Sequence, residues 1–180
     1  QPQKNGHLIA IDAGHQARGN FVTEPVGPGS STRKAKVAGG ATGVASHVPE
    51  YKLTLAVSKK LQKELKARGY KVYMIRTKNN VNISNKKRAQ LANKSGADIY
   101  IRIHADSSNS RAVTGASGLY PSKANRYVSK LSAKSKKLSS CLLKSYCKKT
   151  RYATEVWLQE MTLQEQTGAR YRFLLLKWDF

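Results

Sequence analysis

The stretch Leu8–His15, LIAIDAGH, joins an apolar run to an aspartate and a terminal histidine. A second apolar run, Ile99–His104, reads IYIRIH and also ends on histidine. Short apolar runs of this kind predict buried strands. In an open α/β sheet the ends of such strands form the edge at which ligands bind. We therefore expect His15 and His104 at the edge of a sheet, although either one has an alternative interpretation as an ordinary, partly buried strand-end residue.

Strand patterns alternate with helix patterns along the 180 residues of the chain. Strands are predicted at about 7–14, 70–77, 98–105 and 118–121, and helices at about 51–68, 84–95 and 125–148. This alternation predicts an α/β fold in a single domain, with a twisted, mostly parallel sheet and helices on both faces. Residues 16–48 are rich in Gly, Ser, Thr and Pro, and they predict one long loop of the kind that is usually functional.

The charge of the chain is strongly positive, with 33 Lys and Arg against 10 Asp and Glu and a net charge of +23. Such a surface attracts polyanions, so a nucleic-acid-binding domain and a non-catalytic wall-binding module are both alternatives to an enzyme. The sequence has no zinc-finger or RNP signature, and an anionic cell wall would attract it equally well. We expect no membrane span, because no stretch approaches the ~20 apolar residues that one needs.

A hydrolytic zinc site needs three protein ligands from histidine and carboxylate side chains, and a water in its open position. Glu50 begins the helix that follows the long loop, so its carboxylate is a candidate third ligand at the edge that carries the two histidines. The alternative is that Glu50 only offsets the helix macrodipole. His47 and Glu24 are competing ligands, and we expect His7 at the surface.

Two cysteines, Cys141 and Cys147, fall within one predicted helix. Six residues of helix separate them by roughly 9 Å of rise, beyond the ~7 Å Cα separation that a disulfide tolerates. We therefore expect packed thiols and no bridge. The chain has no CxxC, which argues against a thiolate zinc site.

Three motifs occur in a fixed order: IDAGH at residues 11–15, PEY at residues 49–51 before an amphipathic helix, and IRIHAD at residues 101–106. Together they resemble the zinc-dependent N-acetylmuramoyl-L-alanine amidases of bacterial cell walls, in the type-3 catalytic domain of autolysins, sporulation hydrolases and phage endolysins. The resemblance runs from about residue 7 to about residue 149.

The resemblance implies that His15, Glu50 and His104 bind Zn²⁺. It implies hydrolysis of the amide between the lactyl group of N-acetylmuramic acid and L-alanine by a zinc-activated water. A nearby glutamate would act as general base and then protonate the leaving amine. The partner is then anionic peptidoglycan, with no specific nucleic acid. We expect a secreted protein that acts at the cell wall as a monomer.

The tail from about Arg151 departs from this family, whose catalytic glutamate lies on a late strand in an apolar-Glu-Met/Ile-Gly-Phe motif. Codons allowed for the residues from Thr154 onward, read in the adjacent frame, yield TGTNW, IP and EMGF in the order that the family carries them. We interpret residues from 151–154 to 180 as out of frame.

In that interpretation Lys177 stands about where the catalytic glutamate belongs, and the catalytic residue is unassigned. The glutamates of the tail, Glu155, Glu160 and Glu165, are weak alternatives, because their spacing is an accident of the frame. The run 171–176 is apolar enough to occupy the vacated strand position.

Overall fold

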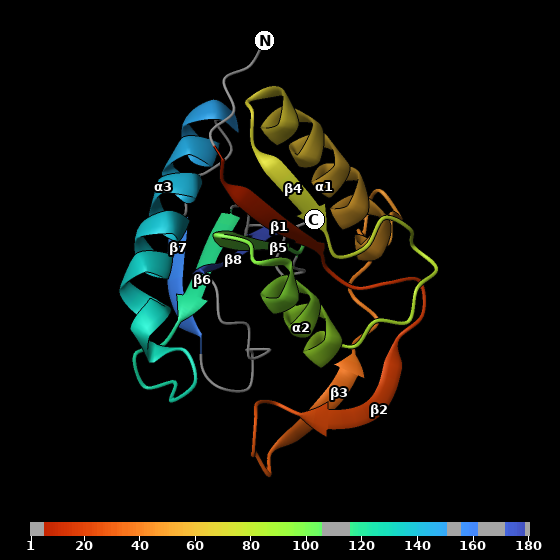
Figure 1. The fold of residues 1–180 in the computed structure, drawn as a ribbon. Helices are drawn as coiled ribbons and strands as arrows, with labels where there is room; N and C mark the ends of the chain where they lie inside the picture. Colours follow the sequence, from red (N-terminus) through yellow and green to blue (C-terminus); the bar gives the residue numbers. More distant parts are fainter. Residues whose placement is uncertain (1–5, 106–115, 151–155, 162–171, 179–180) are drawn as a thin grey trace.

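The computed structural model describes residues 6–105 and 116–150, and the backbone of residues 156–161 and 172–178. Within these residues, a six-stranded sheet with the order β4-β1-β5-β8-β6-β7 forms the centre of the fold (Figure 1). The strands are β1 (Leu8–Ala13), β4 (Lys71–Met74), β5 (Ile99–Ile103), β6 (Ala116–Pro121), β7 (Val156–Met161) and β8 (Arg172–Trp178). Within this sheet only β6 and β8 pair antiparallel, so the predicted mostly parallel sheet is confirmed.

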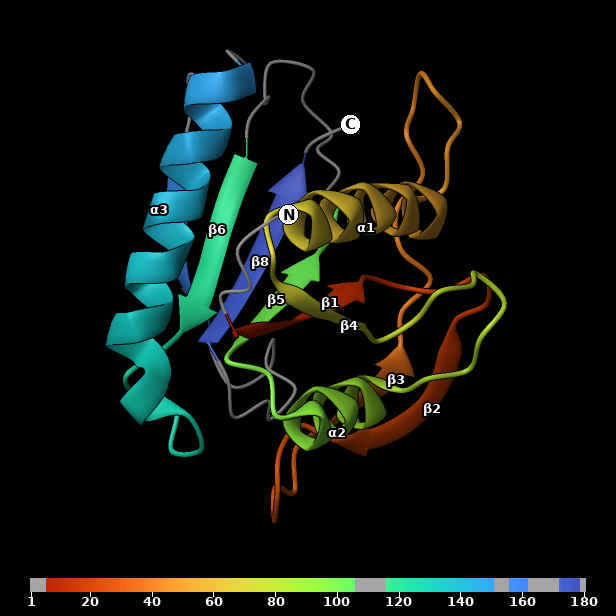
Figure 2. The ribbon, with the colours of Figure 1, turned by 45° about the horizontal axis from the view of Figure 1, so that its top comes forward.

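Three helices cover the sheet: α1 (Glu50–Ala67), α2 (Asn85–Ser95) and α3 (Ser132–Thr150). Ile9 and Ile11 of β1 point to the face that α1 and α3 cover, where Leu61 and Leu142 belong to the same cluster. Ala10 of β1 points to the other face, where it clusters with residues of α2. Figure 2 shows α2 apart from the other two helices, so the predicted helices on both faces are confirmed. None of the described helices is long and apolar enough to span a membrane.

The ends of α1 and α2 follow local signals in the sequence. Ser84 caps α2, because its Oγ accepts a hydrogen bond from the backbone N–H of Lys87 at 3.1 Å. Gly96 ends α2 with a left-handed φ of 69°, and Gly69 follows α1 with a φ of 85°. Both helix stops were therefore predicted correctly from glycine.

The third helix begins later than predicted. A turn and the short 3-10 helix η1 (Ser129–Leu131) precede α3, so the expected start at residue 125 is wrong. The Asn125 side chain accepts a hydrogen bond from the backbone N–H of Tyr127 at 2.9 Å, a local bond that competes with helix formation. Both cysteines of α3 are free. The expectation of packed thiols is wrong for Cys141, which is exposed on the solvent side of the helix.

The predicted long loop contains an antiparallel hairpin of β2 (Asn20–Pro25) and β3 (Arg33–Val37), which the sequence analysis missed. The hairpin forms its own two-stranded sheet, separate from the main sheet (Figure 1). Gly29 has a φ of 69° in the connecting turn, a conformation that favours glycine. The strands are short and rich in polar residues, so they lack the apolar runs that revealed β1 and β5.

The core beneath α3 provides a test of the packing. Leu143 is fully buried, whereas its neighbour Lys144 is exposed. We expect Leu143→Ala to lower the free energy of unfolding by about 2–5 kcal/mol, because it removes apolar contacts and leaves a cavity. Lys144→Ala should change it by less than about 0.5 kcal/mol. Urea unfolding of the three proteins measures both values, and equal stability of the two variants would contradict this packing.

Candidate metal centre

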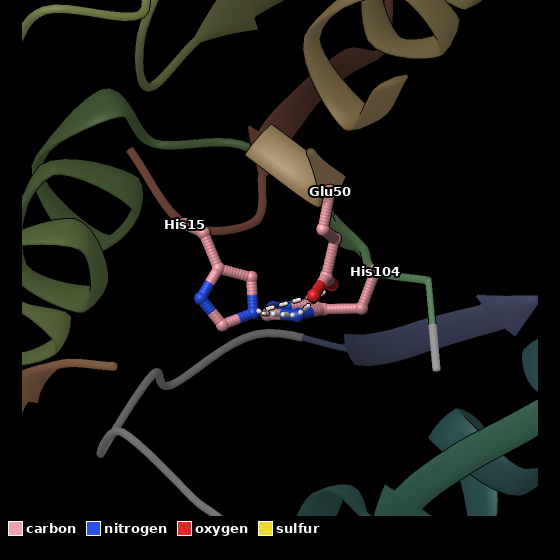
Figure 3. Close-up of side chains that lie close together, drawn as sticks. All are labelled: His15, Glu50 and His104. Atoms are coloured by element: carbon pink, nitrogen blue, oxygen red, sulfur yellow. Dashed lines mark hydrogen bonds and ion pairs between the residues drawn. The ribbon is translucent and has the colours of Figure 1, made fainter. Parts of the chain in front are cut away.

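Three side chains from distant parts of the chain converge at one edge of the sheet (Figure 3). His15 follows β1, His104 follows β5, and Glu50 is the first residue of α1. The strands β1 and β5 pair in parallel up to Ala13 and Ile103, so both histidines lie at the same edge. The candidate ligand atoms of the three residues all lie within 4.8 Å of one another. The position of the two histidines was predicted from the strand ends and that of Glu50 from the helix start, and the role of all three as metal ligands stays a prediction.

The Glu50 carboxylate is held in place by two backbone amides. The N–H of Ala105 donates to Oε1 and that of Ala41 donates to Oε2, each at 2.9 Å. The side chain is buried, and it lies at a helix N-terminus, where negative charge is favoured. Burial raises the pKa of this carboxyl, but the hydrogen bonds to His104 and His15 outweigh burial and hold the pKa well below its usual range. Glu50 is therefore an anion at neutral pH.

Each of the two imidazoles directs a ring nitrogen at this carboxylate. His15 has its Nδ1 2.9 Å from the carbonyl oxygen of Ala38, an acceptor, so Nδ1 carries the proton and Nε2 faces the site. His15 Nε2 lies 3.2 Å from Glu50 Oε2. His104 Nδ1 lies 3.0 Å from both His15 Nε2 and Glu50 Oε1. Burial lowers the pKa of His104 to about 4, so this ring is neutral at neutral pH, as a metal ligand must be.

Two glycines allow the side chains to approach this closely. A Cβ atom on Gly14 would lie 2.6 Å from the His104 ring, and one on Gly40 would lie 2.9 Å from the His15 ring. Gly40 also has a φ of 84°, which favours glycine. The sequence analysis missed Gly40 and the backbone groups of Ala38 and Ala41. Backbone donors and acceptors cannot be identified from residue type. The glycines of the loop before Glu50 were the one indication in the sequence that the chain approaches other groups closely there.

The buried Arg88 side chain fixes the turn that carries His15. Its Nη1 donates to Asp12 Oδ1 at 2.6 Å and to the carbonyl oxygen of Ala13 at 2.9 Å. Its Nη2 donates to the carbonyl oxygen of His15 at 2.9 Å and to Gln16 Oε1 at 3.2 Å. The His15 backbone has a φ of 58°, an uncommon value for a residue other than glycine. Arg88 thus stabilises the uncommon backbone conformation of His15 through the carbonyl oxygen of that residue.

Arg76 joins the same turn to the first turn of α1. Its Nε donates to the carbonyl oxygen of Ala13 at 2.8 Å, and its Nη2 donates to those of Gly14 and Tyr51 at 3.0 and 2.8 Å. The hydroxyl of Thr54 also donates to Gly14 O, at 2.8 Å. Burial, followed by the charge of Arg88, lowers the pKa of Arg76 to about 10, so it stays charged at neutral pH. Arg76 therefore sets the position of Glu50 relative to His15.

The competing candidates lie elsewhere. Glu24 is buried, but its Oε1 accepts a hydrogen bond from the backbone N–H of Lys86 at 2.8 Å, in the first turn of α2. His47 is exposed in the loop before α1. His7 is at the surface, as expected, with its Nδ1 3.3 Å from Asp98 Oδ2. None of the three belongs to the cluster that the described residues form.

The tail returns to the same edge of the sheet. The strand β8 lies between β5 and β6, so the apolar run does occupy a strand position in the sheet. Leu176 pairs with Ile103, the residue before His104, and Lys177 follows it on β8. Glu160 lies on β7, whereas Glu155 and Glu165 are outside the described residues.

The geometry of the cluster fits a small divalent cation. Two imidazole nitrogens and one carboxylate oxygen form a typical ligand set for catalytic zinc, which keeps a fourth position open. Tetrahedral zinc with ligands at about 2.0–2.2 Å places its ligand atoms roughly 3.3–3.6 Å apart. His104 Nδ1 lies 3.0 Å from His15 Nε2 and from Glu50 Oε1, and His15 Nε2 lies 3.2 Å from the other oxygen, Oε2, so each of these contacts is a few tenths of an ångström shorter than that spacing.

An open, mostly parallel sheet with such a cluster at its strand ends is typical of a metal-dependent hydrolase. The family model for N-acetylmuramoyl-L-alanine amidase matches residues 9–172, and the chain therefore belongs to this family. A search of curated proteins finds no match.

Solved structures share the fold. The amidase Ami1 from Mycobacterium smegmatis is 17% identical with a TM-score of 0.80, over 99% of this chain and 83% of that one. The catalytic domain of CwlV, an amidase from Bacillus (Paenibacillus) polymyxa var. colistinus, is 22% identical with a TM-score of 0.67, over 95% and 79%. An N-acetylmuramoyl-L-alanine amidase from Clostridium difficile 630 is 23% identical with a TM-score of 0.66, over 96% and 79%.

The buried charges behind the site give a pH-dependent prediction. Asp12 is fully buried and pairs with Arg88 at 2.6 Å and Arg102 at 3.0 Å. Burial raises the pKa of Asp12, but the two arginines outweigh it and keep the pKa below its usual value. The stabilisation is therefore complete above the unfolded pKa of about 3.9 and is lost as the pH falls through the folded value.

We expect Asp12→Asn to lower the free energy of unfolding by about 3–5 kcal/mol at pH 7, because it leaves buried arginines without a counter-charge. The difference from the parent protein should narrow at pH 3. Urea unfolding at both pH values measures it, with the exposed Glu64→Gln as the control. A difference that is the same at pH 7 and pH 3 would contradict the assignment.

Proposed function

We propose that this protein is a zinc-dependent peptidoglycan amidase that hydrolyses the amide between the lactyl group of N-acetylmuramic acid and L-alanine. His15, Glu50 and His104 are the proposed zinc ligands. The observation that carries the proposal is the convergence of two imidazoles and one buried carboxylate in a member of this family. The amidases named above support the reaction class by their fold.

The residues around the site would keep the ligands in their binding state. The amides of Ala41 and Ala105 hold the Glu50 carboxylate, and the Ala38 carbonyl keeps the proton of His15 away from the site. Bound zinc supplies a water of lowered pKa and polarises the amide carbonyl. Because Glu50 is ionised, the His104 ring is neutral at neutral pH and all three side chains are already oriented, binding costs little rearrangement.

The proposed place of action is the cell wall. Peptidoglycan and its attached polymers are anionic, and the net charge of +23 favours their binding. We propose that the protein acts outside the cell, as a monomer. The same charge would suit a nucleic-acid-binding domain, whose affinity would be indifferent to chelators, and a wall-binding module without activity, which would bind with or without zinc.

Metal analysis separates these functions. We expect one zinc per chain in the purified protein, and its loss together with amidase activity in His15→Ala and His104→Ala, because each removes one of three ligands. His47→Ala, an exposed histidine near Glu50 in sequence, is the control and should keep both. Activity is measured as release of L-alanine amino termini from purified peptidoglycan. A parent protein without stoichiometric zinc would refute the proposal.

The general base of this reaction is unassigned, and we propose that residues from about 151 to 180 are read out of frame. Lys177 on β8 follows the partner of Ile103, so it lies at the site edge in place of an acid–base group. Loss of such a group typically slows a reaction by ~10²–10⁴-fold. Sequencing the encoding DNA tests this interpretation. It would be refuted if one uninterrupted reading frame encoded these residues and the shifted frame did not encode the family motif.

A charge reversal at this position tests the consequence. We expect Lys177→Glu to raise the amidase rate by about 10²-fold, because it restores a group able to accept a proton at the site edge. Lys71→Glu, at the far end of β4, is the control with the same change in charge and should not raise the rate. The zinc content of both variants should match the parent. An unchanged rate in Lys177→Glu would show that this position does not carry the missing function.

A further inference from the structure

The segment from residue 116 to residue 150 contains no aspartate or glutamate. It forms β6, η1 and α3. Its nine basic residues are all exposed: Lys123, Arg126, Lys130, Lys134, Lys136, Lys137, Lys144, Lys148 and Lys149. We call this set the α3 basic surface. Cations without carboxylates between them create a positive potential that an anionic polymer can follow.

The beginning of this surface, after β6 ends, lies away from the candidate metal centre. The strand β6 runs antiparallel to β8, with Ala116 opposite Trp178 and Leu119 opposite Leu175. The start of β6 therefore lies at the edge that carries His104, and its end at Pro121 lies at the opposite edge. The chain continues from there into α3, which packs against β6. This helix covers the same face of the sheet as α1, but at the β6–β7 end of the sheet rather than the β4–β1 end (Figures 1 and 2).

A hollow lies between the end of β6 and the first turns of α3. Its volume is about 600 Å³, and it is lined mainly by Tyr120, Lys123, Ser132, Lys136, Lys137 and Ser140. The Nζ of Lys136 lies 5.5 Å from the centre of the Tyr120 ring, so a cation–π contact holds this ammonium at the hollow. Lysine ammoniums and serine hydroxyls, with the positive end of a 19-residue helix, are donors suited to phosphate oxygens.

The aromatic residues of this surface favour a phosphate chain without bases. Proteins that bind single-stranded nucleic acid stack the bases on exposed aromatic rings. Here Tyr120 is only 8% exposed, and Tyr127 and Tyr146 are half-buried, so no exposed ring among them offers a stacking platform. The exposed cations of the α3 basic surface can therefore bind the phosphates of a polymer, whereas these three tyrosines cannot stack on nucleic-acid bases.

We propose that the α3 basic surface binds a phosphodiester polymer of the type attached to peptidoglycan, with the hollow near Tyr120 as its phosphate subsite. The naming of the wall polymer rests on the proposed function. Because the hollow and the metal centre lie at opposite edges of the sheet, the polymer holds the protein at the wall while the metal centre stays open to the peptide.

Paired substitutions test this site in the full chain. The variant Lys136→Gln/Lys137→Gln removes two ammoniums at the hollow. The matched control, Lys59→Gln/Lys60→Gln, removes the same charge from two exposed lysines of α1. The probe is poly(glycerol phosphate) of defined length, with binding measured by calorimetry at several salt concentrations. Zinc content and thermal unfolding of each variant confirm that it is folded.

We expect Lys136→Gln/Lys137→Gln to weaken binding about tenfold at 0.15 M salt and to lower the slope of log K against log salt by about 1.4, at ~0.7 per phosphate contact. The control should change affinity less than about twofold. Equal losses in the two variants would overturn the proposal, because the attraction would then be diffuse. A single-stranded oligonucleotide with the same number of phosphates that binds more tightly would overturn the choice of polymer.

The amidase assay of the same proteins separates this inference from the proposed function. A parent protein that binds the polymer through Lys136 and Lys137 but contains no zinc would refute the amidase and leave the polymer site intact. A parent protein with zinc and activity, but with affinity unaffected by the hollow variant, would refute the polymer site alone.

Discussion

The buried ion pair between Arg88 and Asp12 is the constraint on which the site depends. Asp12 lies near the end of the buried strand β1, and Arg88 reaches it from α2 on the opposite side of the sheet from α1. The remaining donors of Arg88 bind the backbone of the His15 turn. The position of the candidate ligand His15 is therefore set by the packing of α2, which carries Arg88. Loss of either group would leave its buried partner with fewer counter-charges, so the turn and the helix stabilise each other.

Most of the sheet and the position of the histidines were predictable from sequence. The apolar runs of β1 and β5 are long enough to identify buried strands, and a histidine at the end of each placed both at the edge. Serine and glycine marked the ends of α2 because capping and left-handed backbone are local properties. The convergence of Glu50 with the histidines was not determined by local signals. It depends on where α1 packs.

What the sequence analysis missed has a common physical origin. The β2–β3 hairpin is polar and held mainly by its own backbone pairing, so no apolar periodicity revealed it. Glu24 was a plausible ligand by residue type, but its carboxylate accepts a hydrogen bond from a backbone N–H at the N-terminus of α2. The groups that orient Glu50 and His15 are backbone atoms of residues 38, 41 and 105, which any sequence would supply. Only the folded loop shows their use.

The order of the strands has a consequence for biosynthesis. The strand β8 is made after all the others, yet it lies in the interior of the sheet, between β5 and β6. During translation the half of the sheet that carries the histidine turn and the half covered by α3 therefore have no backbone bridge until this last strand leaves the ribosome. Two open strand edges persist for that time, and such edges invite aggregation. The nascent protein is thus most dependent on chaperones before β8 has been made.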